Sequence, residues 1–128
     1  MEEGVSMVSR QRLGLAGLLL CLSAVVLAEE PDGNSLLRQC RFAMDSNEAQ
    51  TAEERMGGAY CLGMVRGIYA LNDYYLALDR AALCPPRDVS LTRLVEVVVS
   101  YLSDNPAQLR EPDTALAVLA MQSAFPCP

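Results

Sequence analysis

Cysteine is the residue type in this sequence with the clearest capacity for covalent chemistry. Four cysteines, Cys40, Cys61, Cys84 and Cys127, follow residue 28, and Cys21 lies in an apolar run before it. An even number of cysteines in a small exported chain is typical of two disulfides. A metal site is the weaker interpretation, because the sequence has no His and no C-x-x-C pair. We therefore expect no metal and no cofactor.

The other residues that could do chemistry do not form a catalytic pattern. Without His, no Ser-His or Cys-His nucleophile pair is available. No phosphate-binding or dinucleotide-binding loop is present. Glu53 and Glu54 are placed to begin a helix, where acidic residues favour the helix dipole, and Asp73 and Asp79 are isolated. The sequence predicts a protein that is not an enzyme.

The N-terminal segment resembles a secretory signal peptide. Arg10 and Arg12 precede an apolar run from Leu13 to Leu27, and small residues end it at Ala28. We place the cleavage after Ala28, which gives a signal peptide over residues 1–28 and a single domain over 29–128. A retained membrane anchor is the alternative, but the run has about 15 residues and a spanning helix needs about 20. We expect an exported protein with no membrane contact after cleavage.

The charge of the predicted domain argues against nucleic acid as a partner. Residues 29–128 contain fourteen acidic residues, eight arginines and no Lys. The arginines are scattered and form no basic track for phosphates. The excess of acid suits a soluble protein or one that binds a basic partner.

Helical periodicity predicts the elements that position these residues. We expect a short helix over 35–44, a long one from Thr51 to about residue 79, a third from Asp88 or Ser90 to Leu102, and a last one from Pro112 to about residue 124. The run 95–101 also alternates like a strand, but a lone strand would have no pairing partner. The predicted fold is all-α, a small four-helix domain with two disulfides.

The long helix is apolar around most of its girth. Thr51 and Glu54 form a capping box at its start. Gly63 and Gly67 lie four residues apart, on a seam where another backbone could approach closely, and each glycine costs about 1 kcal/mol relative to Ala. We expect close packing against another helix of the domain in preference to a functional groove. A helix this apolar is either central to the domain or part of a homodimer surface.

The helix order suggests a disulfide pairing. If consecutive helices run antiparallel, Cys84 follows the second helix at the end to which the fourth helix returns with Cys127. Cys40 and Cys61 lie on either side of the first connection. We therefore predict the pairs Cys40–Cys61 and Cys84–Cys127.

The connection between the third and fourth helices is the candidate binding segment. Tyr101, Asp104 and Asn105 combine an aromatic ring, an acid and a turn-forming residue between two helices. A plain connecting loop is the competing interpretation.

Four spaced motifs resemble those of bacterial type VI secretion immunity proteins of the Rap/Tai kind. They are a C-x-G-x-x-x-G element at 61–67, the segment 84–90 that begins Cys-Pro-Pro, Tyr101-Leu102 with Pro106, and the closing Phe125-Pro126-Cys127. The resemblance covers residues 40–127, and it departs at Met64, where the family often has an aromatic residue. It implies an all-helical periplasmic protein, often a homodimer, that binds a cell-wall amidase effector and occludes its active-site cleft.

Two other functions remain open from the sequence. One is a small periplasmic envelope-stress chaperone, which the many acidic groups allow but the two disulfides would restrain. The other is a structural homodimer with no enzyme target, which the apolar girth of the long helix suggests.

Overall fold

The computed structural model describes residues 30–128, so the predicted signal peptide and its cleavage point lie outside the described residues. Four α-helices make up this part: α2 over Gly33–Met44, α3 over Ala52–Leu76, α4 over Leu91–Asp104 and α5 over Asp113–Ala124. A single 3-10 turn, η1 over Pro106–Gln108, joins α4 to α5. Residues 30–128 contain no strand, only an isolated bridge between Asp32 and Pro112. The prediction of a small all-α, four-helix domain is confirmed.

Side-chain caps set where three of the helices begin. The predicted capping box is present at α3, where Thr51 Oγ1 accepts from the Glu54 amide and Glu54 Oε2 accepts from the Thr51 amide. Asp32 and Ser35 form a second box at α2. Ser90 caps α4 by accepting from the amide of Arg93. These bonds satisfy amides that the first turn of a helix leaves unpaired.

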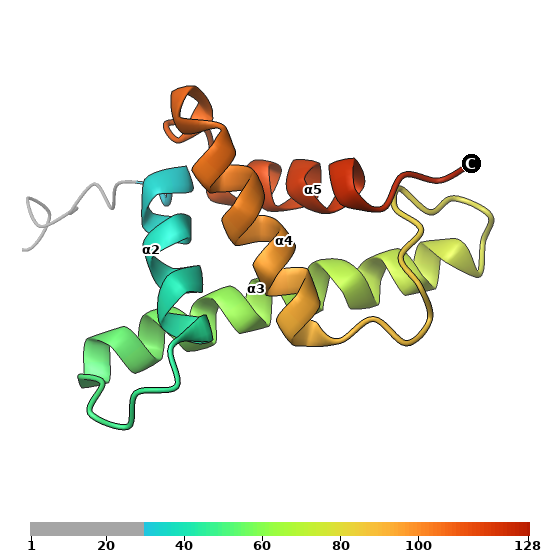
Figure 1. Ribbon diagram of the computed structural model, residues 1–128. Coiled ribbons are helices and arrows are strands. Elements are labelled where there is room, and N and C mark those ends of the chain that lie inside the picture. The colour runs from blue at the N-terminus through green and yellow to red at the C-terminus, as the bar shows by residue number, and fades with distance from the viewer. Residues whose placement is uncertain (1–29) are drawn as a thin grey trace, which may run out of the picture.

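The helices are layered crosswise and do not form a simple up-and-down bundle (Figure 1). Helices α2 and α4 run in opposite directions and lie across α3 and α5, which both run towards the end of the molecule that holds the C-terminus. The assumption of consecutive antiparallel helices is therefore wrong for α2 and α3, which cross. The pairing predicted from it still holds, because α3 and α5 finish at the same end.

Both disulfides are present within the four-helix domain. Cys40 on α2 is bonded to Cys61 on α3, and Cys84 is bonded to Cys127. The first bond lies in the core, where side chains from all four helices meet. The largest fully buried side chains besides these cysteines are Leu36, Val65, Leu83, Leu94, Val95, Val98, Leu102, Leu116 and Met121.

The glycines of α3 have different roles from those predicted. A Cβ on Gly58 would lie 3.2 to 3.3 Å from backbone atoms of Phe42 and Ala43, so Gly58 is where α2 and α3 pack most closely. A Cβ on Gly63 or Gly67 would meet nothing within 4 Å. The expectation that another helix of the domain packs against Gly63 and Gly67 is therefore wrong. Both glycines lie on the outer face of α3, because the core takes up the opposite face.

Candidate functional site

The three residues predicted to bind a partner line one groove between α4 and α5. This groove has a volume of about 470 Å³. Its α4 wall includes Tyr101 and Asp104, with Asn105 at the end of the helix. Its α5 wall is formed by Ala120, Ser123 and Ala124. We call it the α4–α5 groove.

Hydrogen bonds fix the end of this groove where α4 gives way to η1. Asn105 Nδ2 donates to the carbonyl oxygen of Tyr101 at 2.8 Å, which satisfies one of the carbonyls left free at the end of α4. The Tyr101 hydroxyl donates to Gln108 Oε1 at 3.0 Å. Tyr101 is half-buried and Asp104 is exposed. The candidate binding segment is therefore the last turn of α4 followed by a short 3-10 turn, and the Tyr101 ring on α4 is held in place by Gln108.

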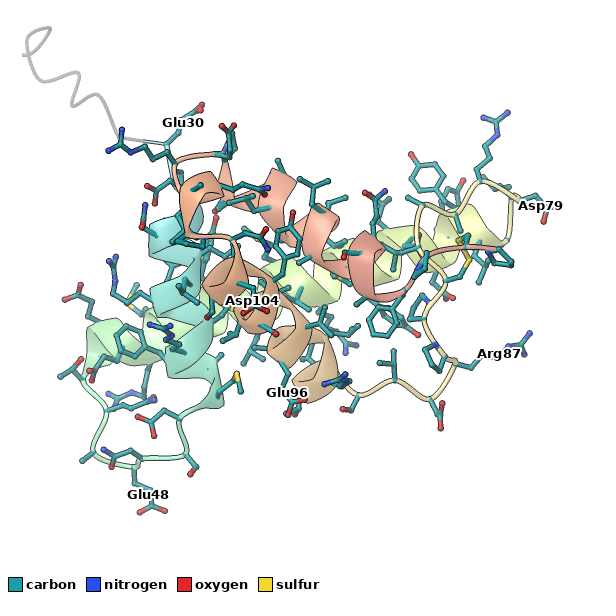
Figure 2. The ribbon with its side chains drawn as sticks, turned by 45° about the horizontal axis from the view of Figure 1, so that its top comes forward. Glu30, Glu48, Asp79, Arg87, Glu96 and Asp104 are labelled. Atoms are coloured by element: carbon teal, nitrogen blue, oxygen red, sulfur yellow. A yellow bond between two sulfur atoms is a disulfide. The ribbon has the colours of Figure 1, made fainter. Side chains whose placement is uncertain are left out.

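The groove carries more acidic than basic groups. Glu96 and Asp104 both lie on α4, where Figure 2 labels them. Arg93 pairs with Glu96 at 3.2 Å, and both side chains are exposed, so this ion pair contributes little stability. Asp104 makes a long contact of 3.4 Å with the Ser100 hydroxyl. The groove is suited to a partner that presents basic or hydrogen-bond-donating side chains.

A second candidate surface is the outer face of α3. It consists of Met56, Tyr60, Gly63, Gly67, Leu71 and Tyr74, and we call it the α3 ridge. Steps of three and four residues place these side chains in one stripe along the helix. Met56 is 73% exposed, Leu71 56% and Tyr74 63%. This stripe of the apolar long helix is thus open to solvent.

Tyr60 joins the α3 ridge to a buried carboxylate that sequence reasoning missed. Its hydroxyl donates to Asp113 Oδ2 at 2.6 Å, and Asp113 is only 5% exposed at the first turn of α5. The Asp113 hydrogen bond, then burial, then the negative charge raise the pKa of Tyr60 to about 12. The one sequence signal for Asp113 is that it is an acidic residue at the predicted start of a helix. Nothing in the sequence indicates that Tyr60 is its partner.

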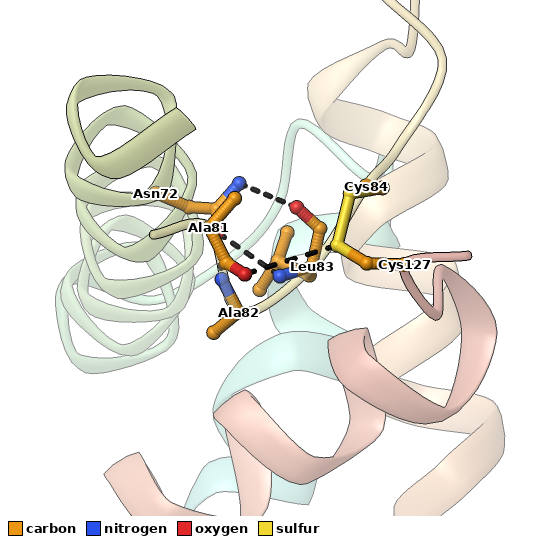
Figure 3. The surroundings of a disulfide bond; sticks show 6 residues. All are labelled: Asn72, Ala81, Ala82, Leu83, Cys84 and Cys127. Carbon is orange, nitrogen blue, oxygen red and sulfur yellow. Dashed lines mark hydrogen bonds between the residues drawn. A yellow bond between two sulfur atoms is a disulfide. The ribbon is translucent and has the colours of Figure 1, made fainter. Parts of the chain in front are cut away.

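A hydrogen-bonded junction holds the ends of α3 and α5 together (Figure 3). Asn72, which is buried on α3, accepts from the amides of Ala82 and Leu83 at 3.0 Å and donates to the Leu83 carbonyl at 2.8 Å. The Cys84 amide donates to the carbonyl oxygen of Phe125 at 2.8 Å. The Cys84–Cys127 disulfide lies beside these bonds. We call this disulfide, with the Cys84–Phe125 hydrogen bond, the C-terminal clasp.

Two further properties apply to the described residues alone. Within residues 30–128, no group of three or more His, Cys, Asp or Glu side chains is placed to hold a metal ion. None of the four helices in this range has the length and apolarity needed to cross a membrane.

A known protein family matches nearly the whole domain. A family model described as "Rap1a immunity proteins" matches residues 32–127. That range contains both disulfides, the α4–α5 groove and the α3 ridge. No curated protein matches the chain.

Proposed function

Because this chain belongs to the family of Rap1a immunity proteins, we propose that it is a periplasmic protein that binds a type VI secreted peptidoglycan amidase and occludes its active-site cleft. In this role the protein performs no chemistry of its own. It protects the producing cell by covering the enzyme, so affinity and shape decide its activity.

The observation that carries the proposal is the convergence of Tyr101, Asp104 and Asn105 on one groove beside a projecting turn. Figure 1 shows the segment from the end of α4 through η1 extending beyond the rest of the helices. Pro106, Ala107 and Gln108 in this turn are exposed. A narrow turn with anchored ends can enter a cleft at little entropic cost, since it is ordered before binding.

The side chains of this site support a division of roles. Tyr101 offers a large ring with few rotatable bonds, the kind of residue that often dominates protein interfaces. Asp104 is exposed and carries a charge that can pair with a basic group at the rim of the enzyme cleft. Asn105 acts through the backbone, because its amide holds the carbonyl of Tyr101.

The direct test is binding to the product of the adjacent gene. Co-expression should allow the two proteins to be purified together, and the chain should rescue cells that produce the enzyme in the periplasm. The triple variant Tyr101→Ala, Asp104→Ala, Asn105→Ala should lose at least about tenfold in affinity, as expected when an aromatic anchor is removed. A Glu48→Ala variant, changed in the exposed loop between α2 and α3, is the matched control.

The outcomes separate clearly. Full rescue by the triple variant would remove these three residues from the site. No binding by the unchanged protein, to this or any cell-wall amidase, would exclude the amidase as its target.

We also propose that the active form is a homodimer joined through the α3 ridge. The ridge has two glycines at its centre and large apolar side chains towards both ends, so it is complementary to a reversed copy of itself. A two-fold interface requires such self-complementarity. In an antiparallel pair centred between Gly63 and Gly67, Met56 of one copy faces Tyr74 of the other. Glycines at the crossing point let the two helices approach closely.

Light scattering at several concentrations tests the dimer. Gly67→Leu places a branched side chain at the proposed crossing point and should shift the protein to monomer. Ala49→Leu, in the exposed α2–α3 loop, adds a comparable side chain away from the ridge and should leave the dimer intact. A monomeric wild-type protein, or a dimer unaffected by Gly67→Leu, would contradict the proposal.

A further inference from the structure

The two disulfides differ in their access to solvent. Cys40 and Cys61 are both 0% exposed and lie in the core. Cys127 is exposed and Cys84 is half-buried. Thiol–disulfide exchange requires a thiolate to reach a sulfur of the bond, so access decides which disulfide a reductant opens. A folded molecule therefore presents one disulfide to a reductant and hides the other.

The exposed disulfide and the hydrogen bonds of Asn72 restrain different segments. The disulfide restrains the chain end after α5, and Asn72 restrains the connection after α3. Asn72 fixes Ala82 and Leu83 to α3 through three hydrogen bonds that do not involve sulfur. The segment after Phe125 is held by the clasp, that is by the Cys84 amide and the bond between Cys84 and Cys127. Opening the disulfide leaves Leu83 in the core and removes the covalent restraint at Cys127, so that the Cys84–Phe125 hydrogen bond and the packing of Phe125 are left to hold the end of α5.

This chain end is continuous with one wall of the α4–α5 groove. Ser123 and Ala124, in the last turn of α5, line the groove opposite the Tyr101 side. The Phe125 amide closes this last turn by donating to the Met121 carbonyl. A turn at the end of a helix frays readily when nothing beyond it is anchored. Phe125 packs against the core, and the clasp anchors the chain on either side of Pro126, so the clasp adds to the order of this wall.

We propose that the Cys84–Cys127 disulfide is a redox-sensitive clasp, opened selectively by a dithiol reductant of the thioredoxin-like class, which loosens the α5 wall of the α4–α5 groove. The selective opening is independent of the proposed function. The effect on partner binding rests on it.

The exchange proceeds in two balanced steps. A thiolate of the reductant attacks Cys127 Sγ, forms a mixed disulfide and releases Cys84 as a thiolate, which takes up a proton. The second thiol of the reductant then loses its proton and attacks the reductant's other sulfur, the one bonded to Cys127. Cys127 leaves as a thiolate and takes up a proton. The reductant leaves oxidised to its disulfide, and the protein gains two thiols.

Stepwise reduction of the full, oxidised protein tests the selectivity. Graded dithiothreitol, followed by alkylation and peptide mapping, should label Cys84 and Cys127 at least about tenfold faster than Cys40 and Cys61, since exchange follows access. Hydrogen exchange of the half-reduced protein should rise over 121–127 and stay unchanged at the core of α4. Labelling of all four cysteines in one step, or an unchanged α5 end, would overturn the proposal.

A variant separates the clasp from other effects of reductant. The double change Cys84→Ser, Cys127→Ser should reproduce the exchange pattern of the half-reduced protein without any reductant. If this variant does not fold, the alkylation series on the unchanged protein still decides the selectivity.

Binding to the amidase distinguishes this inference from the proposed function. The half-reduced protein should bind the enzyme more weakly than the oxidised protein, and reoxidation should restore the affinity. Equal affinity of the two forms would overturn the link between clasp and groove. Failure of the oxidised form to bind would instead count against the proposed function. The selective opening of the disulfide would still be decided by the alkylation test.

Discussion

At the scale of single residues, Tyr60 connects the surface to the interior. Its ring lies on the exposed α3 ridge, while its hydroxyl reaches the buried carboxylate of Asp113. Tyr60 supplies the hydrogen bond at Oδ2 of Asp113, while Thr114 donates to Oδ1, and a buried polar group that lacks such partners is costly. It also fixes the ring, which would lower the entropic cost of the homodimer proposed through the ridge.

The raised pKa of Tyr60 predicts a loss of stability in alkaline solution. The unfolded phenol has its ordinary pKa of 10.0 and the folded one about 12, so the stabilisation is complete below pH 10.0 and is lost as the pH rises through about 12. Because Tyr60 is 41% exposed, solvent screening lowers its contribution to about 1 kcal/mol. Melting temperatures across this range should fall more for the unchanged protein than for Tyr60→Phe. Parallel curves for the two proteins would contradict the assignment.

Two glycines of α3 predict opposite responses to the same substitution. Gly58→Ala should cost about 1–3 kcal/mol, because its methyl group would press on the rigid backbone of α2. Gly63→Ala faces open space and should stabilise the single chain by up to about 1 kcal/mol through helix propensity. Chemical denaturation at low protein concentration measures both. A destabilised Gly63→Ala chain would show that a contact within the domain has been missed.

At the scale of elements, local sequence signals predicted the helices well. Thr51 marked the start of α3, and Ser90, one of two candidates beside Asp88, proved to be the cap of α4, because a side-chain acceptor there replaces a missing helical partner. Periodicity could not tell which face of α3 is buried, since apolar residues occupy most of its circumference. It also could not reveal the crossing of α2 over α3, which depends on how side-chain ridges pack between helices.

The residues of the candidate site also differ in whether the sequence could predict them. Tyr101, Asp104 and Asn105 could be proposed because they are neighbours in sequence at the end of one helix. The α5 wall of their groove could not, because Ser123 reaches it only through tertiary folding. The pair formed by Tyr60 and Asp113 was hidden for the same reason.

Asn72 carries a prediction about the connection between α3 and α4. Replacement by Ala leaves two buried or half-buried amides and one carbonyl without their partner and should cost about 1–3 kcal/mol. Hydrogen exchange at Ala82 and Leu83 should rise most. Asp73→Ala, changed at the exposed neighbouring position, should leave this exchange unaltered. Equal exchange in both variants would mean that other contacts hold the segment.

At the scale of the whole molecule, the groove and the ridge share no residue. The ridge lies on the outer face of α3, and the groove is built from α4 and α5. A dimer formed through the ridge therefore keeps both grooves, one per chain. Two contacts join the helices that carry these surfaces: Tyr60 on α3 bonds Asp113 on α5, and the C-terminal clasp ties the connection after α3 to the end of α5.

Within residues 30–128, the N-terminal end of the domain is fixed by contacts that begin at Pro31. The amide of Asp113 donates to the Pro31 carbonyl, and the amide of Gly33 donates to the Glu111 carbonyl. We propose that cleavage follows Ala28, which would preserve both contacts. Mass spectrometry of protein recovered from the periplasm should find Glu29 as the first residue, and Ala28→Phe should block the cleavage. A product that retains the segment before Ala28 would refute the assignment.

The order of the disulfides along the chain has a consequence for biogenesis. Cys40 pairs with Cys61 and Cys84 with Cys127, so the two covalent loops follow one another without overlap. If the chain is exported from its N-terminus as proposed, the four cysteines after residue 28 yield this connectivity when they pair in their order along the chain. Under that proposal, a thiol oxidase alone would suffice for maturation, and no isomerase would be needed to correct mispaired bridges.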